Sequence, residues 1–168
     1  TLRTTSTGKV GDSWFTTSAP GSDTLTVGTP YIIGTKYAGV GALPAARYTY
    51  VNGRNDNTFN QATPRATASV TTNYIGESQD GSSEFDGRIA EIFMYDASLS
   101  EIQLARIDTY LSVKYGITLT ADNNGNGGLG NVLSGAITEG DYIASDGATV
   151  IWDYSANTAY HNNVTAIG

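Results

Sequence analysis

Apolar residues change their spacing once in the middle of the chain. Over residues 84–95 they fill both alternate sets of positions, with Ile89 and Phe93 in one set and Ile92 and Met94 in the other. A repeat of two residues is typical of a β-strand, and a strand that is apolar on both faces is expected inside a sheet. The pattern therefore predicts a central strand over this segment.

The spacing becomes helical directly after this segment. Apolar positions then recur every three or four residues, at Leu99, Ile102, Leu104, Ala105, Ile107, Tyr110 and Leu111. This repeat is typical of a helix with one buried stripe. Ser98 and Glu101 have the spacing of a capping box, and Gly116 can adopt the left-handed conformation that ends a helix. One α-helix is therefore predicted over about residues 98–115.

The other segments have the composition of short strands and turns. Residues 1–29 predict one or two short strands, and further strands are predicted around an Asn52-Gly53 turn. Residues 142–143 and 150–152 predict a hairpin whose turn lies at 145–148. Apart from the single helix, the chain is predicted to be all-β.

Composition and charge narrow the function classes. The 168 residues include 20 glycines, 11 tyrosines and no cysteine, and 15% of them are charged. A formal charge of -7 argues against nucleic acid and anionic lipid as partners, because both require a basic surface. No apolar run reaches the ~18 residues of a membrane span, so membrane insertion is not expected. After Lys114 the chain has no lysine or arginine, and this acidic third is open to cations.

Two short motifs carry a family resemblance. Residues 87–91 form a Gly-x-Ile-x-Glu pattern, and residues 114–116 form a Lys-Tyr-Gly signature at the helix end. With the strands predicted upstream, residues 30–119 resemble bacterial laminin G-like domains of the concanavalin A-like superfamily. The resemblance implies a jelly-roll β-sandwich with one helix, and it implies further strands before residue 1.

The domain organisation follows from this resemblance. Residues 1–119 are expected to form the laminin G-like jelly-roll portion, with its front strands missing. Residues 120–141 are expected to be an Asn/Gly-rich linker. Residues 142–168 resemble the start of a second module found after laminin G-like domains in large secreted surface proteins of the Bacteroidota. An extracellular or bacterial cell-surface location is therefore expected.

The carboxylates on the predicted strand lack the spacing of a glucanase site. Jelly-roll glucanases place two carboxylates on alternate positions of one strand, about 5 Å apart across the glycosidic bond. A second glutamate is expected four or five residues after Glu84, but Arg88 and Ile89 occupy these positions. The spacing therefore predicts no enzyme. Glu91 is expected to be a structural hydrogen-bond acceptor for a donor from a loop.

Aromatic and amide side chains around the Asn52-Gly53 turn form the predicted ligand site. Aromatic faces pack on sugar rings, while Asn and Asp side chains bond sugar hydroxyls. The predicted residues are Tyr37, Tyr48, Asn52, Arg54, Asn55 and Asp56.

A polar loop after the helix matches the first half of a calcium-binding loop. Asp122, Asn124 and Asn126 stand at positions one, three and five, but position twelve is Leu133 instead of an acidic residue. Asp141 is a fourth predicted calcium ligand. The alternative is a flexible linker without Ca²⁺.

Three functions remain open. The resemblance implies a non-catalytic binding or adhesion module that recognises glycan or protein at the cell surface. A structural or assembly unit, completed by β-strands from another chain or domain, is the alternative. A glycan hydrolase is the third hypothesis, and the carboxylate spacing counts against it.

Overall fold

The computed structural model describes residues 2–4, 7–14, 17–38, 45–61, 74–77, 81, 84–121 and 132–163. In these residues the chain forms strands β1 (Leu2–Thr4), β2 (Lys9–Trp14), β3 (Thr17–Thr24), β4 (Ile33–Ala38), β5 (Ala45–Val51) and β6 (Arg54–Gln61) before helix α1 (Glu101–Tyr115). After the helix follow β7 (Val132–Ser134), β8 (Ile137–Thr138), β9 (Tyr142–Ile143), β10 (Val150–Trp152) and the 3₁₀ helix η1 (Thr158–Asn163). Antiparallel strands with one α-helix confirm the predicted all-β class. No described helix is long and apolar enough to cross a membrane.

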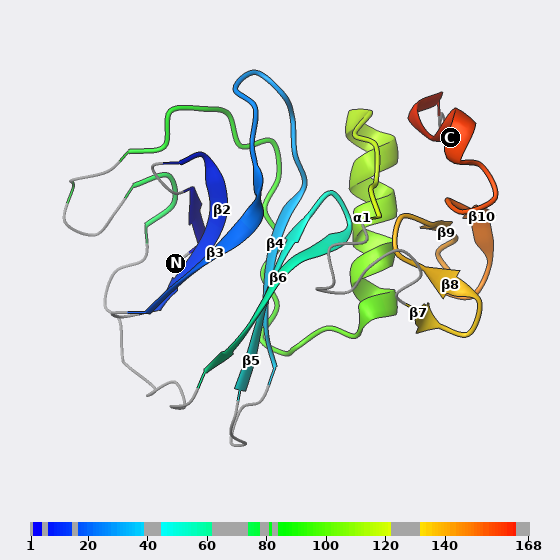
Figure 1. The fold of residues 1–168 in the computed structure, drawn as a ribbon, viewed down its shortest axis with the longest axis horizontal. Coiled ribbons are helices and arrows are strands. Elements are labelled where there is room, and N and C mark those ends of the chain that lie inside the picture. Colours follow the sequence, from blue (N-terminus) through cyan, green and yellow to red (C-terminus); the bar gives the residue numbers. More distant parts are fainter. Residues whose placement is uncertain are drawn as a thin grey trace.

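Two three-stranded antiparallel sheets, β1-β2-β3 and β4-β5-β6, form the N-terminal part (Figure 1). Polar side chains join them where β3 passes β6. Asp56 is fully buried, and its Oδ1 accepts from the backbone N–H groups of Ser22 and Asp23 at 3.1 and 2.9 Å. Asn57 Nδ2 also donates to the Pro20 carbonyl at 2.7 Å. Hydrogen bonds formed by polar side chains of β6 therefore connect the two sheets, whose described strands are not paired with each other through their backbones.

The predicted turn at Asn52 and Gly53 is confirmed. Both residues have positive φ, 49° and 83°, as a tight hairpin between β5 and β6 requires. Asn52 Oδ1 accepts from Ile32 N–H at 2.9 Å, and the Asn52 carbonyl accepts from Thr120 N–H at 2.8 Å. A Cβ on Gly53 would lie 3.0 Å from Leu119 Cδ2. The turn therefore fastens β4 and the segment after α1 to one hairpin.

Helix α1 ends where the sequence predicts but begins two residues later. Gly116 has φ 66° and provides the left-handed C-cap. The predicted N-cap is wrong: Ser100, not Ser98, accepts from Gln103 N–H at 3.3 Å, and Gln103 Oε1 accepts from Ser100 N–H at 2.8 Å. Glu101 cannot act as the capping-box acid, because its carboxylate pairs with Lys36 instead.

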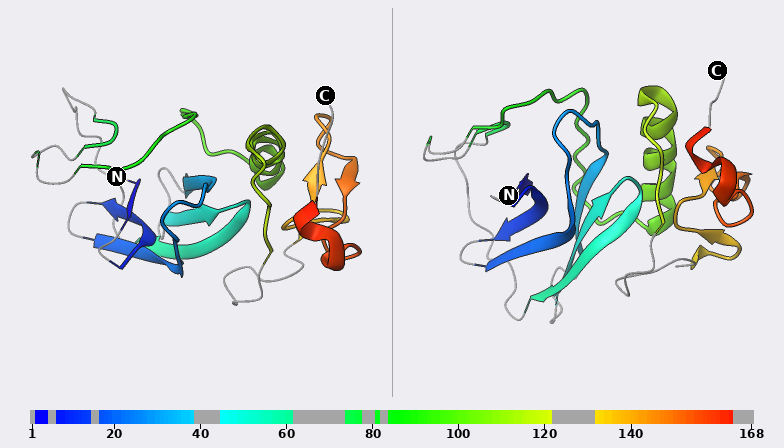
Figure 2. Two further views of the ribbon diagram at one scale, coloured as in Figure 1. Left: turned by 90° about the horizontal axis from the view of Figure 1, so that it is seen from above. Right: turned by 45° about the horizontal axis from the view of Figure 1, so that its top comes forward.

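The predicted central strand over residues 84–95 is wrong. Glu84 forms an isolated bridge with Glu77, and none of residues 85–99 belongs to a strand. In the left view of Figure 2 this green segment runs as a separate layer above the two sheets. Met94 is 86% exposed. An apolar sequence favours a strand only where another strand pairs with it, and no described strand pairs with this segment.

Helix α1 lies between the sheet β4-β5-β6 and the C-terminal strands (Figure 1). The core has two clusters, one of Ile32, Ile117, Leu119 and Tyr142, and one of Ala105, Ile137 and Ile143. The β9–β10 hairpin is confirmed, and Asp146 in its turn accepts from the N–H groups of Ala148 and Thr149, both at 2.9 Å. Strands β7 and β8 lie within the stretch expected to be a linker.

Candidate functional site

One carboxylate connects the two motifs that carry the family resemblance. Glu91, from the Gly-x-Ile-x-Glu pattern, accepts from Lys114 Nζ at 2.9 Å and from Tyr115 OH at 3.0 Å. Tyr110 OH donates to the same carboxylate at 3.3 Å. All three donors lie on the last two turns of α1. Glu91 therefore ties residues 85–95, here called the upper segment, to the helix.

The charges of this contact stabilise each other. The Lys114 ammonium, together with the Tyr115 and Tyr110 hydroxyls, lowers the pKa of Glu91. Hydrogen bonding to Tyr110 and Glu91 raises the pKa of Lys114. At neutral pH the contact is therefore a carboxylate beside an ammonium, and neither group is poised to exchange a proton.

Exposed aromatic rings surround this ion pair. Phe93 and Tyr110 meet edge to face, with ring centroids 6.2 Å apart and an interplanar angle of 74°. The Lys114 ammonium lies 5.0 Å from the Tyr110 ring centroid and 5.3 Å from that of Tyr115. Phe93 is 43% exposed and Tyr110 is 46% exposed. We call Glu91, Phe93, Tyr110, Lys114 and Tyr115 the aromatic surface.

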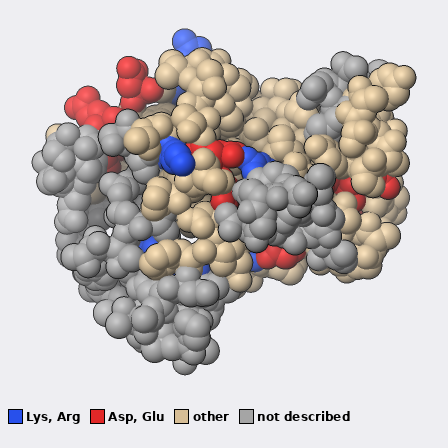
Figure 3. All heavy atoms as spheres, viewed as in Figure 1, with Lys and Arg blue, Asp and Glu red and all other residues tan. Residues whose placement is uncertain are grey.

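The aromatic surface combines two chemistries. Its rings offer flat apolar faces, and Glu91 and Lys114 offer a hydrogen-bond acceptor and a donor next to them. Figure 3 shows that uncharged atoms make up most of the described surface on the face it draws, with charged groups dispersed among them. The arrangement suits a ligand with an apolar face and several hydroxyl or amide groups.

The ligand residues predicted from the sequence lie elsewhere, and three of them are buried. Arg54 forms an ion pair with Asp23, and burial lowers the Arg54 pKa although nearby carboxylates oppose this effect. Asn55 N–H donates to Glu139 Oε1 at 3.0 Å, and Asp56 holds β3. These contacts join β6 to its neighbours, so the structure favours a structural role for Arg54, Asn55 and Asp56.

The two predicted tyrosines lie on opposite faces of their sheet. Tyr48 pairs in register with Lys36, whose ammonium is 4.7 Å from the Tyr48 ring centroid. Tyr37 follows Lys36 in β4 and therefore belongs to the other face. Asn52, the sixth predicted residue, holds Ile32 at the turn. The structure thus does not bring the six predicted residues together at one surface.

The predicted calcium site is only partly described. Asp122, Asn124 and Asn126 lie outside the described residues. Asp141 is buried, and its Oδ2 accepts from Thr138 N–H at 2.8 Å while its Oδ1 accepts from Tyr154 N–H at 2.8 Å. The described residues contain no group of three or more His, Cys, Asp or Glu side chains that could hold a metal ion. Calcium binding stays a prediction.

A second polar cluster lies in the seam between α1 and the sheet β4-β5-β6. Glu101 pairs with Lys36 and accepts from Tyr50 OH at 3.3 Å. Burial raises the pKa of Tyr50, and burial with the nearby Glu101 charge raises the pKa of Asp108 to about 7. These groups face another part of the same chain, so the seam is a packing contact.

The sequence contains a weak signal for the aromatic surface. Tyr110, Lys114 and Tyr115 lie within one and a half turns of a helix, where residues four apart are neighbours. Periodicity assigned Tyr110 to the buried stripe, although it is largely exposed. The contribution of the upper segment could not be predicted. Its contact with the helix joins Glu91 to Lys114, which are 23 residues apart in the sequence, and no local pattern relates them.

The sequence matches two families, which meet in helix α1. Residues 10–105 match the concanavalin A-like lectin/glucanases superfamily, and residues 103–168 match a domain of unknown function. These matches confirm the predicted laminin G-like portion followed by a second module.

Solved structures include one similar chain. It is an S-layer domain-containing protein from Clostridium thermocellum, with 20% sequence identity and a TM-score of 0.43 over 55% of this chain. The alignment spans 45% of that chain. No curated protein matches. Since the first family match covers more than half of the residues, this chain belongs to the concanavalin A-like lectin/glucanases superfamily, with its jelly-roll β-sandwich fold.

Proposed function

We propose that this chain is a non-catalytic glycan-binding module of an extracellular surface protein. The observation that carries the proposal is the aromatic surface, where exposed rings surround an ordered carboxylate and ammonium. The superfamily includes lectins, which supports a sugar ligand over other small molecules. The location outside the cell is part of the same proposal and follows the superfamily and the polar, glycine-rich composition.

The geometry suits a sugar ring in two respects. The C–H face of a pyranose packs on an aromatic ring, and the Tyr110 ring is exposed for such contact. Ring hydroxyls can then donate to Glu91 and accept from Lys114, both of which have fixed positions. Preorganised polar groups improve affinity, because little side-chain entropy is lost on binding.

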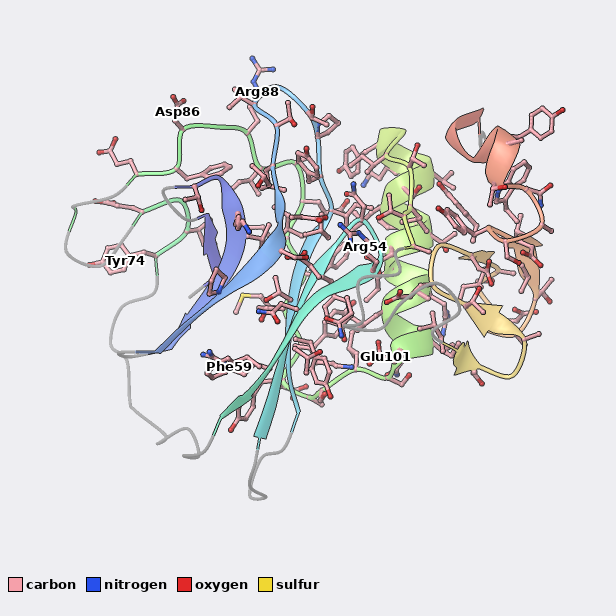
Figure 4. All side chains as sticks on the ribbon, viewed as in Figure 1. Arg54, Phe59, Tyr74, Asp86, Arg88 and Glu101 are labelled. Atoms are coloured by element: carbon pink, nitrogen blue, oxygen red, sulfur yellow. The ribbon has the colours of Figure 1, made fainter. Side chains whose placement is uncertain are left out.

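The same contacts argue for binding without hydrolysis. A glycosidase needs a carboxyl group whose raised pKa keeps it protonated as the general acid. Glu91 has the opposite shift, because Lys114 lowers its pKa. Asp86 points away from the rest of the chain in Figure 4, and the residue after Gly87 is Arg88. We therefore assign no catalytic residue.

A glycan array tests this proposal directly. The 168-residue chain should bind a subset of glycans, and Tyr110→Ala should reduce the binding at least about tenfold, since loss of the stacked aromatic ring should cost about 1.4 kcal/mol or more. Tyr74→Ala is the matched control, because Tyr74 is similarly exposed but lies outside the aromatic surface. Absence of any glycan signal, or equal losses in both variants, would contradict the proposal.

An assembly role is a second candidate, favoured by the upper segment. Its residues belong to no strand although they are apolar on both alternate sets of positions. Ile89, Ile92 and Met94 are all about half exposed or more. Monomeric proteins seldom leave such a run uncovered, and strands from a second polypeptide are one way to cover it.

A further inference from the structure

The upper segment has the composition of a strand but lacks the backbone pairing of one. Among the described residues, the Phe85 N–H donates to the Gly76 carbonyl at 2.7 Å, and no other inter-residue backbone hydrogen bond involves residues 85–95. Ile92 is 48% exposed. A partner that covers this segment would have to offer both backbone hydrogen bonds and apolar side chains, which is the chemistry of another extended polypeptide.

The charges on this segment are self-complementary. Arg88 and Asp96 each lie four residues from Ile92, on opposite sides. Both are exposed, and neither forms an ion pair within the part of the chain that the structure describes. If two copies pair antiparallel about Ile92, each Arg88 lies opposite Asp96 of the second copy.

This register also matches the apolar residues between the charges. It places Ala90 opposite Met94 of the second copy and Ile89 opposite Tyr95 of the second copy. Glu91 lies opposite Phe93 of the second copy, and its charge is paired with Lys114 of its own copy. A shift of one residue would place Arg88 opposite an apolar residue, and a parallel pairing in register would place like charges together. Charge complementarity therefore selects one partner and one register.

We propose that two copies of this chain associate through antiparallel pairing of residues 88–96, with a two-fold axis at Ile92. A two-fold interface uses the same surface on both copies, as this register requires. The inference rests on the assembly role and does not depend on glycan binding. The backbone of the upper segment and the Arg88 and Asp96 side chains form the interface.

Charge exchange tests this pairing in the 168-residue chain. Sedimentation equilibrium over a range of concentrations should show a monomer–dimer equilibrium for the wild type. Arg88→Asp and Asp96→Arg should each raise the dimer dissociation constant about tenfold or more, because each variant replaces two attractive pairs with two repulsive ones. The double variant Arg88→Asp/Asp96→Arg restores both pairs and should dimerise like the wild type.

Asp86→Arg is the matched control. Asp86 is an exposed acid of the same segment, but it would lie opposite the uncharged Ser98 in the proposed register, so its reversal should leave dimerisation unchanged. A wild type that stays monomeric at all concentrations, or a dimer that the double variant does not rescue, would overturn the pairing. A monomer that still binds glycan would overturn this inference alone, while a dimer without glycan binding would overturn only the glycan-binding proposal.

Discussion

Glu91 is the residue that holds the upper segment in place. Its carboxylate collects three donors from α1, and the nearby Lys114 charge lowers its pKa. The sequence predicts a structural acceptor at this position, with its donors in a loop. The donors instead lie at the end of α1, which no local pattern could indicate.

Removal of the Glu91 charge should release the upper segment. In Glu91→Gln the ion pair with Lys114 is lost, so trypsin should cleave after Arg88 several-fold faster than in the wild type. Glu84→Gln is the control, since Glu84 is an exposed glutamate that takes no part in the contact with α1 through Glu91. Equal cleavage rates in the wild type and Glu91→Gln would show that another contact holds the segment.

Asp108 should make stability depend on pH. Burial and the nearby Glu101 charge raise the pKa of the Asp108 carboxyl group from 3.8, its ordinary value, to about 7 in the folded protein. Between these values the folded state binds more protons, so the free energy of unfolding should fall as the pH rises from 4 to 7 and level off above.

Asp108→Asn should remove this pH dependence. Urea denaturation at pH 5 and pH 8 should show a clear loss of stability with pH in the wild type and a smaller loss in the variant. Asp86→Asn serves as the control, because Asp86 is an exposed acid outside both the helix–sheet seam and the proposed pairing of residues 88–96. A pH slope that Asp108→Asn leaves unchanged would place the responsible group elsewhere.

At the scale of elements, local sequence signals are sufficient to predict the turns and the C-terminal end of the helix. The hairpin turn and the helix end both need residues with positive φ, and Asn52, Gly53 and Gly116 are residue types that adopt it readily. The upper segment could not be predicted in the same way, because strand pairing depends on a neighbour that the local sequence does not specify. The predicted N-cap is wrong for a related reason. The carboxylate of Glu101 pairs with Lys36, which lies 65 residues away in the sequence.

The helix start can be tested with two serines. Ser100→Ala should destabilise the protein by about 1 kcal/mol, because Gln103 N–H then loses its acceptor. Ser98→Ala should have almost no effect, since Ser98 is exposed and lies before the cap. Chemical denaturation measures both changes. A larger effect of Ser98→Ala would return the cap to the position that the sequence suggested.

At the scale of the whole molecule, helix α1 joins the two family matches. Residues 10–105 and 103–168 overlap within it, and the core cluster of Ile32, Ile117, Leu119 and Tyr142 draws on both. Tyr142 OH accepts from Ser112 Oγ at 3.0 Å and from Leu119 N–H at 3.1 Å. The two matched stretches should therefore unfold together.

Leu119→Ala tests this coupling. Leu119 is 2% exposed, so its truncation should destabilise the protein by about 3 kcal/mol. Trp14 is replaced by Phe so that the fluorescence reports on Trp152 alone. Far-UV circular dichroism and Trp152 fluorescence should then show coincident transitions, both with Leu119 present and in the Leu119→Ala variant. Two separated transitions would show that the stretches are independent domains.

The central claim is that the aromatic surface binds glycan without cleaving it. Isothermal titration calorimetry with a glycan that is positive on the array measures this most directly. Mass spectrometry then examines the glycan recovered from the calorimeter cell. We predict one saturable site on the wild type, at least about tenfold weaker binding for Tyr110→Ala, unchanged binding for Tyr74→Ala, and an intact glycan. Wild-type affinity in Tyr110→Ala, or a cleaved glycan, would contradict the account.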